Sequence, residues 1–122
     1  MTLEFEIEGL PKMTNTSRVH WTKIRKERRL WKDKVENAVR LERERTAIEF
    51  KTLSKAKVTI VRFSSVAPDY DGLVSAGKAI LDGLVEAKVI IDDNVSVIGR
   101  PDYLWQKAKP KEGKIRVKVE AA

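Results

Sequence analysis

Residues 18–67 contain neither glycine nor proline, the two residues that most often interrupt a regular backbone. In the first part of this span, apolar residues recur at roughly helical spacing while basic residues fill the other positions. The apolar positions are Ile24, Trp31, Val35, Ala38 and Leu41. The pattern predicts one long helix that begins at about Arg18, ends near Thr46 and packs on one side only.

Segments with strand patterns surround this helix. Leu3, Phe5 and Ile7 alternate with glutamates, and residues 56–66 are rich in β-branched side chains. Residues 95–105, which contain Gly99 and Pro101, and residues 114–120 predict two further strands, joined by a loop at 110–113.

A second helix is predicted from about Gly72 to Ala87. Its expected buried stripe consists of Leu73, Ala76, Gly77, Ile80, Leu81 and Leu84. The order is therefore β-α-β-α-β-β, which predicts one α+β domain, residues 1–122, with two helices packed against a small mixed sheet.

Positive charge is concentrated in one segment. The net charge is +7, and Arg18 to Lys34 contains eight basic residues against two acidic ones. A basic helix face either binds a polyanion such as nucleic acid or simply keeps the protein solvated. Trp21, Trp31 and His20 are able to stack on bases, but aromatic residues at helical spacing more often fill a core.

Other classes of protein fit the sequence poorly. There is no cysteine, which excludes disulfides and cysteine-ligated metal sites. Neither a membrane-spanning apolar run nor a signal peptide is apparent, so we expect a cytoplasmic protein that does not associate with membranes.

Two pairs of aspartates flank the predicted second helix: Asp69 with Asp71 before it, and Asp92 with Asp93 after it. Each pair is also good turn chemistry, and Asp71 is suitably placed to cap the helix. If the pairs converge, their repulsion favours a bound divalent cation, and carboxylate oxygens suit Mg²⁺ or Mn²⁺. On a basic surface, such a site predicts phosphodiester hydrolysis.

Lys78 follows Asp71 by seven residues and should lie on the same face of the helix. Two roles are open for its ammonium group. It either offsets charge on a reacting phosphate or forms an i, i+4 ion pair with Asp82.

Three segments together resemble the RusA-type Holliday-junction resolvases: PDYDGL at 68–73, KAILDGL at 78–84 and IDDN at 91–94. The opening strand, the basic helix and the closing two-strand unit extend this likeness over most of the chain. Gly72 replaces the family's usual Asn, and the spacing from Asp71 to Lys78 is longer than in the type member.

The resemblance implies a homodimeric, Mg²⁺-dependent endonuclease that nicks four-way DNA junctions symmetrically. It assigns the metal to Asp69, Asp71 and Asp93, and an essential role to Lys78. It also matches Asn15 to an N-terminal family position and places the basic residues along the DNA arms. These are Arg18, Lys23, Arg25, Lys26, Arg28, Arg29 and Lys32.

Two alternatives to a junction resolvase remain. One is a nucleic-acid-binding protein of the same fold without catalytic activity, in which the aspartates only shape turns. The other is a metal-dependent nuclease that acts on other branched DNA or on RNA.

Overall fold

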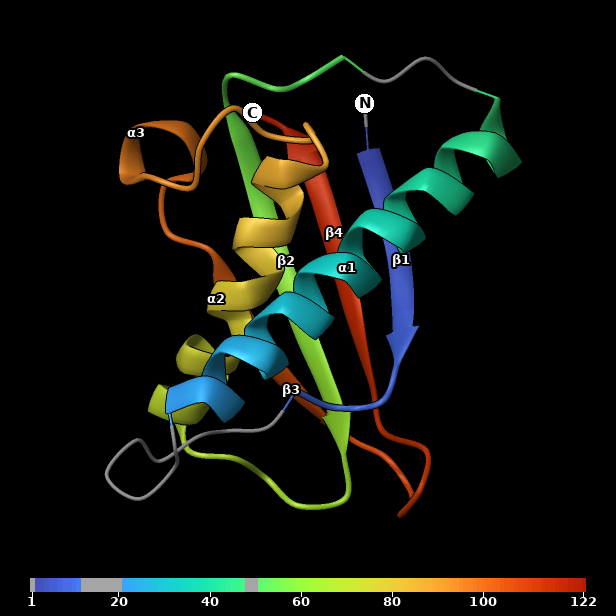
Figure 1. The fold of residues 1–122 in the computed structure, drawn as a ribbon, viewed down its shortest axis with the longest axis vertical. Coiled ribbons are helices and arrows are strands. Elements are labelled where there is room, and N and C mark those ends of the chain that lie inside the picture. Colours follow the sequence, from blue (N-terminus) through green and yellow to red (C-terminus); the bar gives the residue numbers. More distant parts are fainter. Residues whose placement is uncertain (1, 12–20, 48–50) are drawn as a thin grey trace.

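The computed structural model describes residues 2–11, 21–47 and 51–122, and its main elements follow the predicted order (Figure 1). A one-turn helix is the only addition to that order within these ranges. The elements are β1 (Thr2–Glu8), α1 (Trp21–Thr46), β2 (Ala56–Ser64), α2 (Tyr70–Glu86), α3 (Val95–Ile98), β3 (Asp102–Lys107) and β4 (Lys114–Ala121).

The four strands form one mixed sheet in the order β1-β4-β2-β3. β4 is antiparallel to both of its neighbours, whereas β3 runs parallel to β2 at one edge. One row across the sheet joins Phe5, Val117, Ile60 and Tyr103. Because side chains alternate along a strand, this row lies on a single face of the sheet.

Both long helices cover that same face (Figure 1). α1 buries Trp31, Val35 and Val39 between the sheet and α2. The Trp31 indole also donates a hydrogen bond to Glu27 at 3.2 Å. No helix in the described ranges is both long and apolar enough to cross a bilayer.

The prediction that Leu41 belongs to the packed side of α1 was wrong, since its side chain is 53% exposed. Buried positions of α1 are spaced by four residues, so the stripe continues to Val39. Each residue turns the helix by about 100°, which places Leu41 about 200° from Val39, on the opposite side.

The predicted strand over 95–105 was also wrong in its first part. Residues 95–98 form α3 because the Asn94 side chain accepts a hydrogen bond from the Val97 amide at 3.2 Å. A side-chain acceptor in this position satisfies an amide at the start of a helix. Gly99 then turns the chain with a φ of 59°, and the strand begins only at Asp102.

The two long helices approach each other closely at Gly83 of α2. A Cβ atom built there would lie 2.8 Å from Val35 Cβ and 3.3 Å from Lys32 Cα. Neither atom is the end of a flexible side chain, so only glycine allows this distance between the helices.

Gly83→Ala should therefore destabilise the protein, although alanine is the better helix former by about 1 kcal/mol. Overpacking typically costs about 1–3 kcal/mol, so we expect a net loss of roughly 1–2 kcal/mol in the free energy of unfolding. Urea denaturation measures it. Ser75→Ala, at an exposed position on the same helix, is the control and should change stability by less than about 0.5 kcal/mol. Equal effects of the two substitutions would contradict the packing argument.

Candidate active site

Asp69 and Asp71 both lie at the N-terminus of α2 with their carboxylates in solvent. The helix begins at Tyr70, so the N-cap is Asp69, and its side chain makes no capping hydrogen bond. Asp71 falls in the first turn, where a negative charge is favoured by the helix dipole. The alternative in which Asp71 caps the helix was therefore wrong, and both carboxylates face solvent.

Lys78 contacts two aspartates from different parts of the chain. Its Nζ lies 2.6 Å from Asp93 Oδ2 and 3.0 Å from Asp82 Oδ1. The i, i+4 pair with Asp82 is present, but the shorter contact is with Asp93. Hydrogen bonds to Asp93 and then Asp82 raise the pKa of Lys78, and the hydrogen bond from Lys78 lowers the pKa of Asp93.

The turn at 92–94 explains why the second aspartate of the pair meets Lys78. Asp92 accepts hydrogen bonds from the Asp93 amide at 2.7 Å and from the Asn94 side chain at 2.9 Å. Its carboxylate holds the turn together. Asp93 is left with its own carboxylate directed at α2, where it contacts Lys78.

Tyr103 and Tyr70 were not identified from the sequence as part of this region. The Tyr103 ring lies against Gly77, where an added Cβ would meet its Cε1 atom at 2.5 Å. It also meets the Tyr70 ring edge to face, with centroids 6.5 Å apart. Burial raises the pKa of Tyr103, and Tyr70 and Asp93 raise it further. The sequence signal for this contact was Gly77, a residue without a side chain in the predicted buried stripe of α2.

The described residues do not bring the three predicted metal ligands together. Among them, no group of three or more His, Cys, Asp or Glu side chains is arranged to hold a metal ion. Asp71 and Lys78 share a face of α2 but lie about 10.5 Å apart along its axis at about 1.5 Å per residue. In this arrangement the residues do not fit a three-carboxylate Mg²⁺ centre, because the cation that Asp93 contacts is the ammonium of Lys78.

The basic residues of α1 that were predicted to bind nucleic acid divide into two sets. Arg29 and Lys32 contact Glu86 of α2 at 3.2 and 3.6 Å, so they join the two helices. The others in the described part of α1 are exposed on its first turns, where Arg25 also stacks over the Trp21 ring at 3.8 Å. This exposed set consists of Lys23, Arg25, Lys26 and Arg28.

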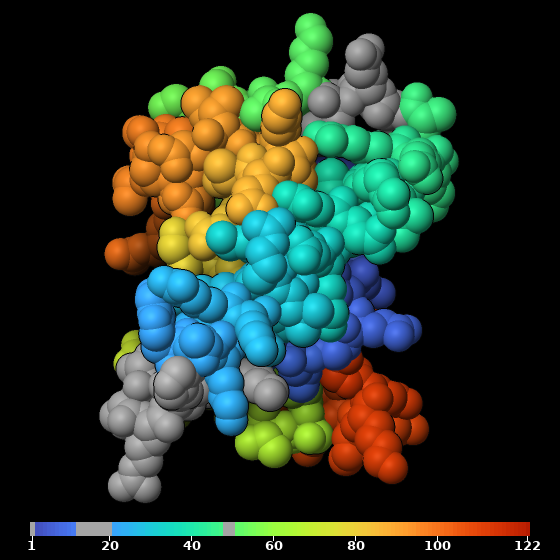
Figure 2. All heavy atoms as spheres, viewed as in Figure 1, coloured from blue at the N-terminus to red at the C-terminus, as the bar shows by residue number. Residues whose placement is uncertain are grey.

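The start of α1 forms part of the molecular surface in Figure 2, at the same end as the segment that leads from β2 to α2. Trp31 is a core residue with 1% exposure, whereas Trp21 is 58% exposed. The remaining predicted nucleic-acid contacts, Asn15 and Arg18, lie outside the described residues, as does His20.

A comparison of the chain with protein-family models gives no match, and neither does a comparison with curated proteins. The resemblance to the junction resolvases therefore depends on the three segments quoted above and on the element order.

The contact between Lys78 and Asp93 makes a prediction about pH. Lys78→Met should raise the pKa of Asp93 toward its ordinary value, because it removes the main group that lowers it. A carboxyl whose pKa is lowered by folding stabilises the folded state above its unfolded pKa, and this contribution is lost as the pH falls through the folded pKa. The variant should therefore lose less stability than the parent between about pH 7 and about pH 3.

Carboxyl ¹³C NMR titration measures the Asp93 pKa, and denaturation at the two pH values measures stability. Lys55→Met, at an exposed lysine before β2, is the matched control and should leave Asp93 unchanged. An Asp93 pKa that does not move in Lys78→Met would refute the contact.

Proposed function

We propose that the chain is a cytoplasmic, homodimeric endonuclease that cuts four-way DNA junctions by paired nicks. One observation carries the proposal. Lys78 lies on the α2 face that also presents Asp71, and it contacts Asp93 from beyond the end of the helix. Three of the four predicted catalytic residues are thus associated with one helix face, beside the exposed Asp69.

The chemistry available on this face suits a phosphodiester. An ammonium group has three N–H donors, and Asp82 and Asp93 accept from two of them. The third is available to a phosphate oxygen, where it offsets charge that develops in the transition state. Asp93, with its lowered pKa, remains an anionic acceptor at neutral pH, and Tyr103, with its raised pKa, remains a hydroxyl donor.

Magnesium, which the resemblance implies, supplies Lewis acidity and a more acidic bound water wherever it is held. Asp69, Asp71 and Asp93 are the candidate ligands. For Asp93 to serve as one, its carboxylate must first leave Lys78, so the arrangement described above requires a rearrangement before metal binding.

A second candidate is a nucleic-acid-binding protein that does not cut. The absence of a metal-holding group among residues 2–11, 21–47 and 51–122 favours it, as do the exposed cations of α1. In that case, Asp69 and Asp71 contribute only to the start of α2, and phosphate contacts supply binding without sequence preference.

Cleavage assays separate these candidates. The protein is incubated with labelled four-way junction, linear duplex and single-stranded RNA, each with Mg²⁺ or with EDTA. Paired nicks on the junction that require Mg²⁺ are expected. Binding without cutting would support the second candidate, and cutting of duplex or RNA would indicate a nuclease of different selectivity.

Asp71→Asn should reduce junction cleavage below about one hundredth of the parent rate, by analogy with the loss of one electrostatic group from an active site. It should leave junction affinity equal or higher, because it removes a negative charge from a surface that meets phosphates. Single-turnover cleavage and fluorescence anisotropy measure the two effects. Asp102→Asn, the same change at an exposed position at the start of β3, is the control. Joint loss of affinity and cleavage would instead assign Asp71 a role in the fold.

A further inference from the structure

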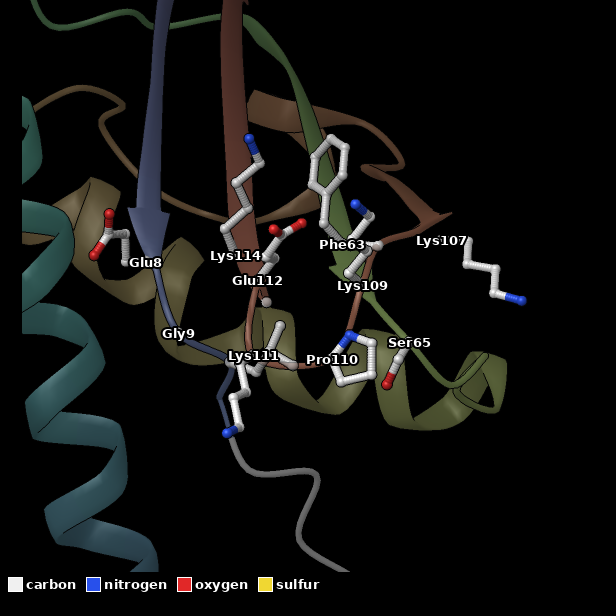
Figure 3. A pocket seen from close by; sticks show the side chains of 13 residues that line it. Glu8, Gly9, Phe63, Ser65, Lys107, Lys109, Pro110, Lys111, Glu112 and Lys114 are labelled. Carbon is white, nitrogen blue, oxygen red and sulfur yellow. The ribbon is translucent and has the colours of Figure 1, made fainter.

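An open groove of about 1480 Å³ lies between the β3–β4 loop, the end of β1 and the end of β2 (Figure 3). Four of its lining residues are lysines, spread over the eight-residue segment KAKPKEGK at 107–114. Phe63 and Ser65 of the neighbouring chain segment also line it. The predicted nucleic-acid contacts of α1 are not part of this groove.

The cations around the groove are of two kinds. Lys114 and Arg116 both contact Glu6, at 3.3 and 2.8 Å, and both lie over the Phe63 ring. Arg116 also lies 3.9 Å from Glu4, so two carboxylates of β1 face these two cations, and Lys114 forms part of the wall. The side chains of Lys107, Lys109 and Lys111 are exposed and make no ion pair or hydrogen bond with any described residue. These three, called the loop lysines below, carry the unpaired charges of the groove.

The backbone that carries the loop lysines is held at both ends. The Ala108 amide donates to Ser64 O at 3.0 Å, and the Gly9 amide donates to Gly113 O at 2.9 Å. Gly113 also lies against Leu10, whose side-chain carbons would be 2.7 Å from an added Cβ. The loop is thus attached to β1 and β2, so its ammonium groups extend from a fixed backbone and lose less entropy on binding.

Lys111 occupies a backbone conformation that favours glycine. Its φ is 69°, in the left-handed region. A long basic side chain in that conformation stores strain that glycine would avoid. The loop therefore carries a lysine at a position where glycine would make the backbone more stable.

We infer that the loop lysines bind the sugar-phosphate backbone of a nucleic acid. This deepens the proposed function, on which it rests for the class of ligand. Ser65 begins the segment that leads to Asp69, and Figures 1 and 2 place this segment, the start of α1 and the β3–β4 loop at the same end of the molecule. The acidic N-terminus of α2 thus shares one end of the protein with two basic surfaces, each suited to one arm of a branched substrate.

The groove suits nucleic acid better than a lipid surface. Peripheral membrane binding combines basic residues with large apolar side chains that insert between lipids. Among the described residues that line the groove, Phe63 is the only aromatic one, and it is 7% exposed beneath Lys114 and Arg116. The described lining also contains Glu8 and Glu112, but its four lysines outnumber them, and a concave lining with a net positive charge fits a phosphate chain.

The test is Lys109→Gln/Lys111→Gln, compared with Lys51→Gln/Lys55→Gln. Both variants remove two charges from exposed lysines whose side chains make no ion pair or hydrogen bond with any described residue, but residues 51 and 55 precede β2 at the other end of the sheet (Figure 1). Binding of labelled four-way junction and linear duplex is measured in EDTA over a range of salt concentrations. The loop variant should bind on the order of tenfold more weakly, and the slope of log K against log salt should fall by about 1.8 for duplex. The control variant should keep most of the parent's affinity and most of its salt slope.

Because EDTA prevents metal-dependent cutting, this result is independent of catalysis. Parent protein that binds DNA but does not cut it would overturn the nuclease proposal and leave the proposed binding by the loop lysines unaffected. Equal effects of the two variants on affinity and salt slope would overturn binding by the loop lysines and leave the nuclease proposal unaffected. Loss of binding to phosphatidylserine vesicles in the loop variant, with DNA binding unchanged, would also overturn it.

Lys111→Gly distinguishes a weaker contact from a damaged fold. It relieves the left-handed strain, so the variant should be at least as stable as the parent in urea denaturation. It should nevertheless bind duplex more weakly, with a salt slope lower by about 0.9. Unchanged affinity in this variant would contradict a role for Lys111.

Discussion

The packing of α2 against two neighbours at once determines the position of the candidate site residues that this helix carries. Gly83 brings the helix within van der Waals distance of α1, and Gly77 admits the Tyr103 ring from the edge strand. With these two contacts made, the helix has no freedom to rotate, because interiors are close-packed. Its remaining face, which carries Asp71 and Lys78, must then point to solvent. The apolar packing of one side thus fixes where the charged side is presented.

Local patterns were sufficient to predict β1, α2, β4 and the end of α1, because each depends on periodicity within one segment. They failed at 95–98, where one hydrogen bond from the Val97 amide to the Asn94 side chain outweighs a β-branched sequence. They also could not place Tyr103 beside Gly77, since that contact depends on the parallel pairing of β2 with β3. In the candidate site, the face shared by Asp71 and Lys78 followed from helical spacing, whereas the Lys78–Asp93 contact depends on the turn after α2. The hydrogen bonds within such a turn decide where its side chains point, and these bonds cannot be deduced from the spacing of residues in the sequence.

Positive charge serves two different purposes in this fold. Arg29, Lys32, Lys114 and Arg116 all contact glutamates on neighbouring elements, so their charges are largely satisfied within the protein. The first turns of α1 and the loop lysines have exposed charges instead. Net charge alone does not distinguish these sets, and neither does density along the sequence, since Arg29 and Lys32 lie within the most basic segment. In these two regions, the positions of Glu6 and Glu86 separate the cations that are paired within the protein from those that are exposed.

Asp93 has a charge environment that bears directly on the proposed nuclease function. A carboxylate with 21% of its side chain exposed is partly desolvated, and the ammonium of Lys78 at 2.6 Å compensates for that. A divalent cation would compensate for it more strongly, but it would repel Lys78 at the same distance. The two cations therefore compete for one carboxylate unless a further anion joins the site. A phosphate group is such an anion, since it would accept a hydrogen bond from Lys78 and leave the carboxylates of Asp69, Asp71 and Asp93 to hold a divalent cation, which would supply Lewis acidity. Under the proposed function, metal binding and nucleic-acid binding should then favour each other, so that the three aspartates would come together when nucleic acid is bound.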